Sequence, residues 1–226
     1  MTHALWPAPV VQADATLESK DANGEGLDLE LKLVRDQRRD AIRSQLRVIA
    51  PEGAAGSVFE VSSSPGTPLR REIYLAPMRR TRELTGLRRT DSFLGSEFSY
   101  EDLEIAAPRE SEWRHVEHSE ENDRRVVRVT SGPYASYERV EVMLDAATAL
   151  PLRVSFFDWE GALYKTETFG EIQTVDGHPM PTRIEMDDVQ GGGKSVLRLR
   201  NIKLGGPLDE KLFSESPLRK GPPPAH

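Results

Sequence analysis

Hydrophobic and polar residues alternate along much of the chain with a period of two. In residues 27–34, LDLELKLV, leucines at the odd positions alternate with charged residues. This pattern is typical of a β-strand with one buried face. The polar cluster at 35–40 separates this run from a second one, in which Ile42, Leu46 and Val48 share a face. The two runs therefore predict an antiparallel hairpin.

Similar runs follow along the rest of the chain, and turn residues such as Pro65-Gly66 and Asp176-Gly177 separate several of them. No long helical pattern lies between them, which favours a meandering antiparallel sheet over βαβ units. A twisted sheet of about ten strands does not stay open and flat, so it forms a sandwich or bends into a complete or partial barrel. The further strands are predicted at 57–62, 69–76, 78–84, 112–118, 124–130, 137–145, 151–159, 162–172, 181–189 and 194–204.

The two ends of the chain differ in composition from the alternating runs. Residues 1–26 are rich in Ala, Pro, Gly and small polar residues, with only a weak helical pattern at 10–20, and predict a flexible lead-in or partial lid. The Pro-rich residues 219–226 predict a disordered tail. A single domain is expected between them, over 27–218, with a short helical turn at 208–213.

The overall charge argues against one class of partner. The net charge is -7 at pH 7, whereas binding to a phosphate backbone favours a positive total, so no nucleic acid is expected as a partner. One stretch, 70–90, carries seven arginines and two glutamates, a local balance of +5. This stretch is interpreted either as a solvated strand face or as a patch that faces anions or a membrane.

Cysteine content and apolar runs narrow the possible chemistry further. The chain contains no cysteine, which excludes disulfides, thiolate metal sites and a cysteine nucleophile. No run approaches the roughly eighteen apolar residues that a membrane helix needs. The first residues lack a charged segment followed by an apolar one, so they do not form an intact signal peptide.

Two short motifs resemble ligand sites but do not fit their surroundings. His115 and His118 have metal-ligand chemistry, but residues three apart on a strand point to opposite faces, so no metal is predicted. The segment QGGGKSV, 190–196, resembles the end of a phosphate-binding loop, but Asp188 replaces the first glycine of that motif. Both flanks read as strands, so this segment predicts a hairpin turn.

The sequence offers little support for catalysis. It contains no Gly-x-Ser-x-Gly elbow, His-Glu-x-x-His motif or dinucleotide fingerprint. The carboxylates of Glu97, Glu101, Asp102 and Glu104 could form an acid–base pair, but acidic residues in a short turn are usually solvated. We therefore expect that the protein is not an enzyme and that it binds no cofactor.

The segment 91–103, DSFLGSEFSYEDL, interrupts the alternating pattern and is called the insert below. It combines three aromatic rings, a glycine and four carboxylates without a regular period. Ser99 and Asp102 fit a capping box and predict a short helical turn at 98–103. The apolar residues of the insert must be buried against something, and the sheet is the nearest candidate. They either close the end of the core or face a ligand.

Several segments together resemble a known family. The insert, the preceding IYLAPMRRTREL and the later segments ALPLRVSFFDWEGALYKTETF, HPMPTRIEMDD and LDEKLF are similar to periplasmic outer-membrane lipoprotein-sorting proteins related to LolA, in particular to the branch associated with lipid-exporting transporters. The resemblance covers about Leu27 to Leu218. It implies a mainly β fold, in which one curled antiparallel sheet forms an unclosed half-barrel with short covering helices. Residues 9–23 match the family's amphipathic first helix poorly.

The resemblance also implies a function. It predicts a periplasmic carrier, its signal peptide removed, that holds acyl chains of a lipoprotein or lipid in an apolar cavity and moves them between envelope membranes or to and from a transporter. Each buried methylene contributes about 0.8 kcal/mol, so such a cavity shields an acyl chain from water. The expected partners are acyl chains, an inner-membrane transporter and, transiently, a membrane. The alternative is an envelope-stress sensor or protein-interaction module of the same fold. The predicted cavity-lining residues are Tyr74, Met78, Leu84, Phe93, Leu94, Phe98, Tyr100, Phe156 and Phe169.

Overall fold

Strands make up most of the protein, as the alternating pattern predicts. The computed structural model describes residues 6–38, 41–103, 113–121, 124–134, 136–208, 211–214 and 216–219. Most of the predicted tail, 219–226, lies outside these ranges. The strands are β1 Val10–Lys20, β2 Asp28–Arg38, β3 Ala41–Ala50, β4 Val58–Ser63, β5 Arg70–Leu75, β6 Arg80–Glu83, β7 Trp113–Glu121, β8 Arg124–Ser131, β9 Arg139–Asp145, β10 Pro151–Phe157, β11 Leu163–Val175, β12 His178–Asp188 and β13 Lys194–Leu204.

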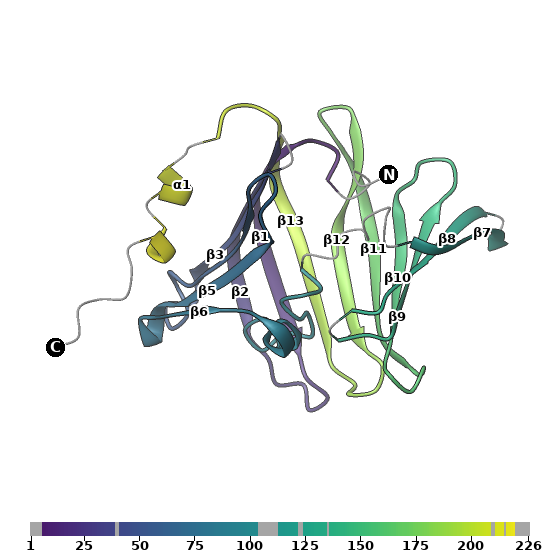
Figure 1. Ribbon diagram of the computed structural model, residues 1–226, viewed down its shortest axis with the longest axis horizontal. Coiled ribbons are helices and arrows are strands. Elements are labelled where there is room, and N and C mark those ends of the chain that lie inside the picture. Colours follow the sequence, from purple (N-terminus) through teal and green to yellow (C-terminus); the bar gives the residue numbers. More distant parts are fainter. Residues whose placement is uncertain are drawn as a thin grey trace. The chain divides into compact units, whose positions relative to one another are not determined.

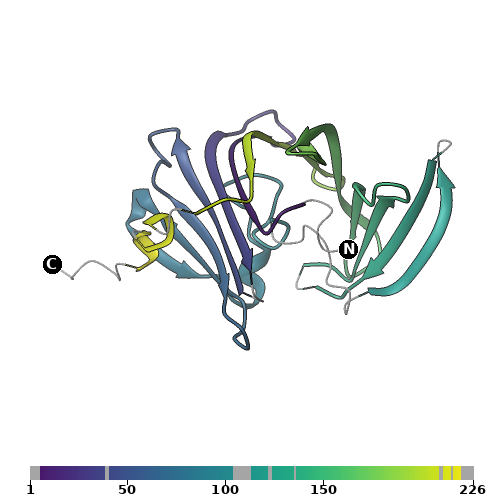
Figure 2. The same ribbon diagram turned by 90° about the horizontal axis from the view of Figure 1, so that it is seen from above.

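All of these strands belong to one antiparallel sheet. Its order is β6-β5-β4-β3-β2-β1-β13-β12-β11-β10-β9-β8-β7 (Figure 1). Strands that follow one another in the sequence are therefore neighbours in the sheet, except for β6 and β7, and the first strand β1 pairs with the last strand β13. The hairpin of β7 and β8 forms one edge (Figure 2). Because β6 and β7 are the two ends of the order, the sheet is not closed into a barrel. The predicted fold class is confirmed.

Strand β1 is the main correction to the sequence-based prediction. Residues 10–20, interpreted as part of a flexible lead-in with a weak helical pattern, form a strand between β2 and β13. Its odd positions are buried, among them Val11, Ala13 and Leu17. Alanine contributes little to a hydrophobicity pattern, so the period of two was hidden in this segment. The other boundaries of the predicted domain stay a prediction.

Helices are short and few among the described residues. They are η1 Ala76–Met78, η2 Gly86–Thr90, α1 Lys211–Ser214 and η4 Pro217–Arg219. The helical turn predicted at 208–213 corresponds to α1. In the part of the chain that the structure describes, no helix has the length and apolar character needed to cross a membrane.

Contacts divide the chain into two compact units, each with its own buried face. The first unit includes Gly86–Arg198 and Leu17–Leu27, and the second includes Ala8–Thr16, Asp28–Thr85 and the residues from Leu199. In the second unit, the register of β2 to β5 aligns four buried apolar side chains into one row. These are Leu33, Leu46, Phe59 and Ile73.

The C-terminal segment covers the opposite face of the second unit. The Gln45 side chain on β3 donates a hydrogen bond from Nε2 to the Leu212 carbonyl at 3.2 Å. The Arg43 guanidinium lies 4.8 Å from the centre of the Phe213 ring. Figure 2 shows α1 beside the strands of this unit. Both faces of this part of the sheet are therefore buried.

Candidate functional site

The insert folds as a compact loop that follows η2. Its two arms are joined by the backbone hydrogen bond from Phe93 N to Phe98 O at 2.7 Å. The turn between them needs a left-handed backbone at Leu94 (φ 51°) and Gly95 (φ 85°), which glycine adopts without steric cost. Phe93 and Tyr100 pack edge to face with ring centres 5.6 Å apart.

The predicted capping box is confirmed at the end of the insert. Ser99 N donates to Asp102 Oδ2 at 2.7 Å, and Asp102 N donates to Ser99 Oγ at 3.1 Å. This reciprocal pair satisfies two backbone donors that a short helical turn leaves without partners. The local sequence therefore fixes the position of the Asp102 carboxyl before any contact with the sheet.

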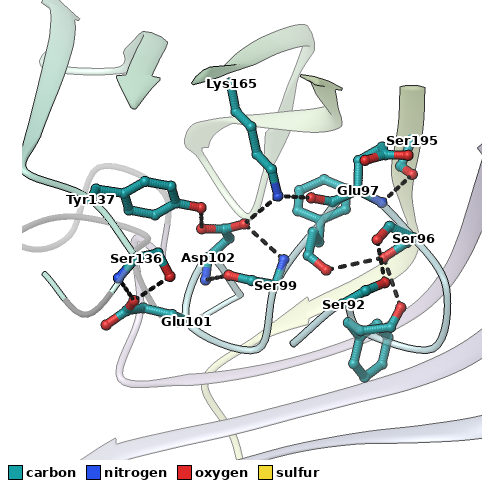
Figure 3. Close-up of polar contacts among 12 residues, drawn as sticks. Ser92, Ser96, Glu97, Ser99, Glu101, Asp102, Ser136, Tyr137, Lys165 and Ser195 are labelled. Carbon is teal, nitrogen blue, oxygen red and sulfur yellow. Dashed lines mark hydrogen bonds and ion pairs between the residues drawn. The ribbon is translucent and has the colours of Figure 1, made fainter. Parts of the chain in front are cut away.

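The insert is attached to the first unit's sheet by polar contacts (Figure 3). Glu97 N donates to Ser195 Oγ on β13 at 2.9 Å, and Lys165 Nζ on β11 donates to the Glu97 carbonyl at 2.6 Å. On its other side, the Glu101 carboxylate accepts hydrogen bonds from Ser136 N and Oγ at 3.1 and 2.9 Å. The insert therefore covers the face of the sheet to which Lys165 and Ser195 point.

The covered face combines six apolar side chains with five polar ones, which come from β8, β11, β12 and β13. The cross-strand register gives two adjacent rows on this face, because residues directly opposite each other point the same way. Apolar side chains from β8, β9, β10 and β12 fill most positions, and nearly all are less than one-tenth exposed. One row is Val129, Val142, Val154, Glu167, Met186 and Ser195, and the next is Ser131, Val140, Phe156, Lys165 and Asp188.

Asp102 is the central acceptor of a buried polar network. Its side chain is fully buried, and Oδ1 accepts a hydrogen bond from Tyr137 OH at 2.7 Å while Oδ2 lies 3.8 Å from Lys165 Nζ. Burial raises the pKa of Asp102, whereas Lys165 and the hydrogen bonds from Ser99 and Tyr137 lower it. The pKa of Tyr137 is raised by burial and by the Asp102 charge, so Tyr137 remains a donor. Overall the pKa of Asp102 is raised, because burial is the largest of these effects.

Glu167 shares the covered face with Lys165 but has a different environment. It is 6% exposed and lies between Val154 on β10 and Met186 on β12. Burial, and then the negative charge of Asp102, raise its pKa well above the ordinary value of a glutamate. Both effects have the same sign, so no charge or hydrogen bond of the described residues offsets the rise in the pKa of Glu167.

The structure places the nine residues predicted to line a cavity in different environments. Five of the nine are buried. They are Leu84 in the loop after β6, Phe93, Phe98 and Tyr100 in the insert, and Phe156 on β10. Leu94 and Phe169 are half-buried, and Phe169 shares the covered face because it lies opposite Ile184.

Three of the nine lie in the second unit: Met78, Tyr74 and the buried Leu84. Met78 is 63% exposed in η1. Tyr74 is opposite Val58 on β4, so it lies on the face opposite to Phe59. That these nine residues line a cavity stays a prediction, and the register favours those of the covered face.

Other candidates from the sequence lie outside this network. His115 and His118 are exposed on edge strand β7, opposite Thr130 and Val127. Among the described residues, no group of three or more His, Cys, Asp or Glu side chains could hold a metal. The segment at 190–196 joins β12 and β13 as a hairpin, as predicted. Glu104 lies outside the described residues.

Sequence reasoning missed Lys165, Glu167, Tyr137 and Ser195. A signal for two of them exists in the strand 163–175. Lys165 and Glu167 have the same parity as Phe169, so charged residues stand where the alternation predicts buried positions. A charged residue with the parity of the buried face indicates either a partner across the core or a site.

Comparisons with solved structures define the fold class of this chain. Among solved structures, a domain from Vibrio parahaemolyticus provisionally described as an outer membrane lipoprotein-sorting protein has a TM-score of 0.81 and 23% identity, covering 93% of this chain and 92% of that one. A DUF1329 family protein from Desulfovibrio piger has a TM-score of 0.82 and 18% identity, covering 94% and 92%. The LolA superfamily protein NE2245 from Nitrosomonas europaea has a TM-score of 0.72 and 17% identity, and the match covers 94% of this chain and 93% of that one. The fold is therefore LolA-like.

The sequence also matches a protein family directly. A family described as "Uncharacterized protein" matches residues 43–220, and the chain belongs to that family. None of the curated proteins matches the chain.

Proposed function

We propose that this protein is a periplasmic carrier that binds the acyl chain of a lipoprotein or lipid between the insert and the covered face of β8 to β13. The observation that carries the proposal is the apolar character of that face. An acyl chain that replaces water against these side chains gains about 0.8 kcal/mol per methylene. The similarity in fold to a lipoprotein-sorting domain supports the same function.

The way the insert is attached suits a removable cover. The insert is not a strand of the sheet, and its links to β11 and β13 include the single hydrogen bonds made by Lys165 and Ser195 to the Glu97 backbone. Each such bond contributes about 1 kcal/mol net. Separating the buried pair of Lys165 and Asp102 costs roughly 3–5 kcal/mol more, which the burial of about twelve methylenes at about 0.8 kcal/mol each offsets. In the proposed carrier, the insert moves away from the sheet to admit the chain and to release it.

Lipid occupancy tests the proposal directly. Protein purified from the periplasm of producing cells is extracted and its lipids are identified by mass spectrometry. Displacement of the fluorescent probe N-phenyl-1-naphthylamine by acyl lipids then measures affinity. We expect copurified acyl lipid and saturable displacement.

Two variants and a matched control locate the binding site. Phe98→Asp is expected to abolish binding, but Phe98 is 1% exposed and the change also destabilises the domain. Phe169→Asp is therefore the decisive variant, because Phe169 is only half-buried. It should weaken binding about tenfold or more, since burial of a Phe side chain contributes roughly 1.5–3 kcal/mol. Ile172→Asp is the control, because Ile172 lies on the same strand and is 49% exposed. Unchanged binding by a folded Phe169→Asp variant would reject the site.

A further inference from the structure

The hairpin of β5 and β6 carries three arginines that lie in solvent. Strand β6 is the last strand on one side of the sheet (Figure 1). Arg79, Arg80 and Arg82 are exposed. In the part of the chain that the structure describes, no carboxylate forms an ion pair with any of them. Arg70 on β5 of the same hairpin, by contrast, pairs with Glu72.

The register places two of these arginines on one face of the hairpin. Arg80 lies opposite Leu75 and Arg82 lies opposite Ile73, so both guanidinium side chains leave the same face of the sheet. Glu83 is the only acidic residue of β6, and its strand parity directs it to the other face. The edge of the first face is therefore positively charged.

Protection of an edge strand does not explain a single sign of charge. Charged side chains on an edge strand prevent pairing with another chain, and either sign serves this purpose. The other edge strand, β7, carries both signs, with Arg114 beside Glu117, Glu120 and Glu121. Three arginines without acidic partners, in a protein with a net charge of -7, instead indicate an anionic partner.

An exposed apolar side chain stands directly beside the arginines. Met78 in η1 is 63% exposed. The turn that carries it is ordered, because Ala76 N donates to Ser57 Oγ at 3.0 Å and Arg79 N donates to the Ala76 carbonyl at 3.1 Å. Arg79 has a left-handed backbone (φ 50°), a conformation that glycine adopts more easily. Apolar side chains flanked by cations are typical of surfaces that bind the interface of an anionic bilayer.

We propose that the tip of this hairpin, formed by Met78, Arg79, Arg80 and Arg82, docks on a bilayer that contains anionic phospholipids. Met78 enters the headgroup region, and the guanidinium groups donate hydrogen bonds to lipid phosphates. This docking surface is independent of the proposed acyl-chain site, so each can fail without the other.

Flotation of the full chain with vesicles of phosphatidylcholine, with and without phosphatidylglycerol, tests the proposal. Wild type should bind the vesicles that contain phosphatidylglycerol, and added salt should weaken the binding. Each arginine near an anionic surface contributes about fivefold to binding, so Arg80→Gln with Arg82→Gln should weaken it about tenfold or more. Arg114→Gln with Arg125→Gln is the matched control, since it removes the same charge from exposed positions on β7 and β8 and should bind as wild type does.

A single labelled cysteine tests whether Met78 enters the bilayer. The chain contains no cysteine, so Met78→Cys provides one site for an environment-sensitive nitrobenzoxadiazole dye. Its emission should shift to the blue when phosphatidylglycerol vesicles are added. The dye on Val116→Cys should not respond, because Val116 is 47% exposed but lies on β7.

Three outcomes would overturn the proposal. Equal losses in the two double arginine variants would show that net charge alone drives binding. An equal shift of the dye at both labelled positions would show that the hairpin tip has no special role. If wild type floats with neither kind of vesicle, membrane docking is rejected and the arginines face another partner, such as an acidic protein segment.

Discussion

The two units of this protein both bury carboxylates, but they satisfy them differently. In the second unit, Glu60 accepts a hydrogen bond from Gln45 Nε2 at 3.3 Å. Glu72 Oε1 lies 2.8 Å from Arg70 Nη2, and Asp36 Oδ2 lies 3.0 Å from Arg43 Nη2. In the first unit, Asp102 has a comparable set of partners. Among the described residues, Glu167 is the exception in this comparison, because none of them pairs with its carboxyl group.

The difference separates two roles for a buried charge. A carboxylate whose partners are supplied by the protein holds segments together. Asp102 does this for the insert through Tyr137, and Glu60 on β4 does it through Gln45 on β3. A carboxyl that lies on an apolar face without such partners lowers stability, and this cost is typical of functional sites. Burial alone would not distinguish Glu60 from Glu167, since both are less than one-tenth exposed.

The largest effect is expected for Asp102→Ala. The substitution leaves Lys165, whose side chain is 8% exposed, without its counter-charge and removes the acceptor of Tyr137 OH. Breaking a buried pair from one side costs roughly 3–5 kcal/mol. Urea unfolding should show this loss, and the double variant Asp102→Leu with Lys165→Met should recover most of it. A loss below about 1 kcal/mol, the usual value of an exposed pair, would contradict a buried network.

Two matched substitutions sharpen the comparison between the units. Glu60→Leu should destabilise the protein by about 1–3 kcal/mol, because Gln45 loses an acceptor in a buried site. Glu167→Leu replaces a carboxyl that pairs with none of the described residues by an apolar side chain and should be neutral or stabilising. Urea unfolding of both variants checks the difference. Equal losses at the two positions would mean that Glu167 has a stabilising partner after all.

The smallest effect is a pH dependence that Glu167→Gln removes. Because the pKa of Glu167 is raised in the folded protein, its contribution to stability is fully present below its ordinary pKa of 4.5 and is lost as pH rises through the folded value. The loss is at most about 1.4 kcal/mol per pH unit. Urea midpoints measured upward from pH 4.5 should show wild type losing stability relative to Glu167→Gln. A constant difference across this range would show that Glu167 titrates normally.

The sequence by itself determined the mainly β fold and most of the strands. Alternation with a period of two is a local property, so the runs at 27–34 and 194–204 were readable without knowledge of their neighbours. The capping box of Ser99 and Asp102 is local as well and was predicted correctly. The strand β1 was missed, because alanines on its buried face carry little hydrophobic signal.

Only the tertiary structure decided which side chains meet on the covered face. Lys165 and the Glu97 carbonyl are 68 residues apart in the chain, and Tyr137 and Asp102 are 35 apart. Lys165 and Glu167 have the same strand parity and share a face, but parity does not say which loop covers that face or which partner the loop brings. The insert supplies partners for Lys165 but not for Glu167, because a hydrogen bond depends on distances between segments that no local pattern encodes.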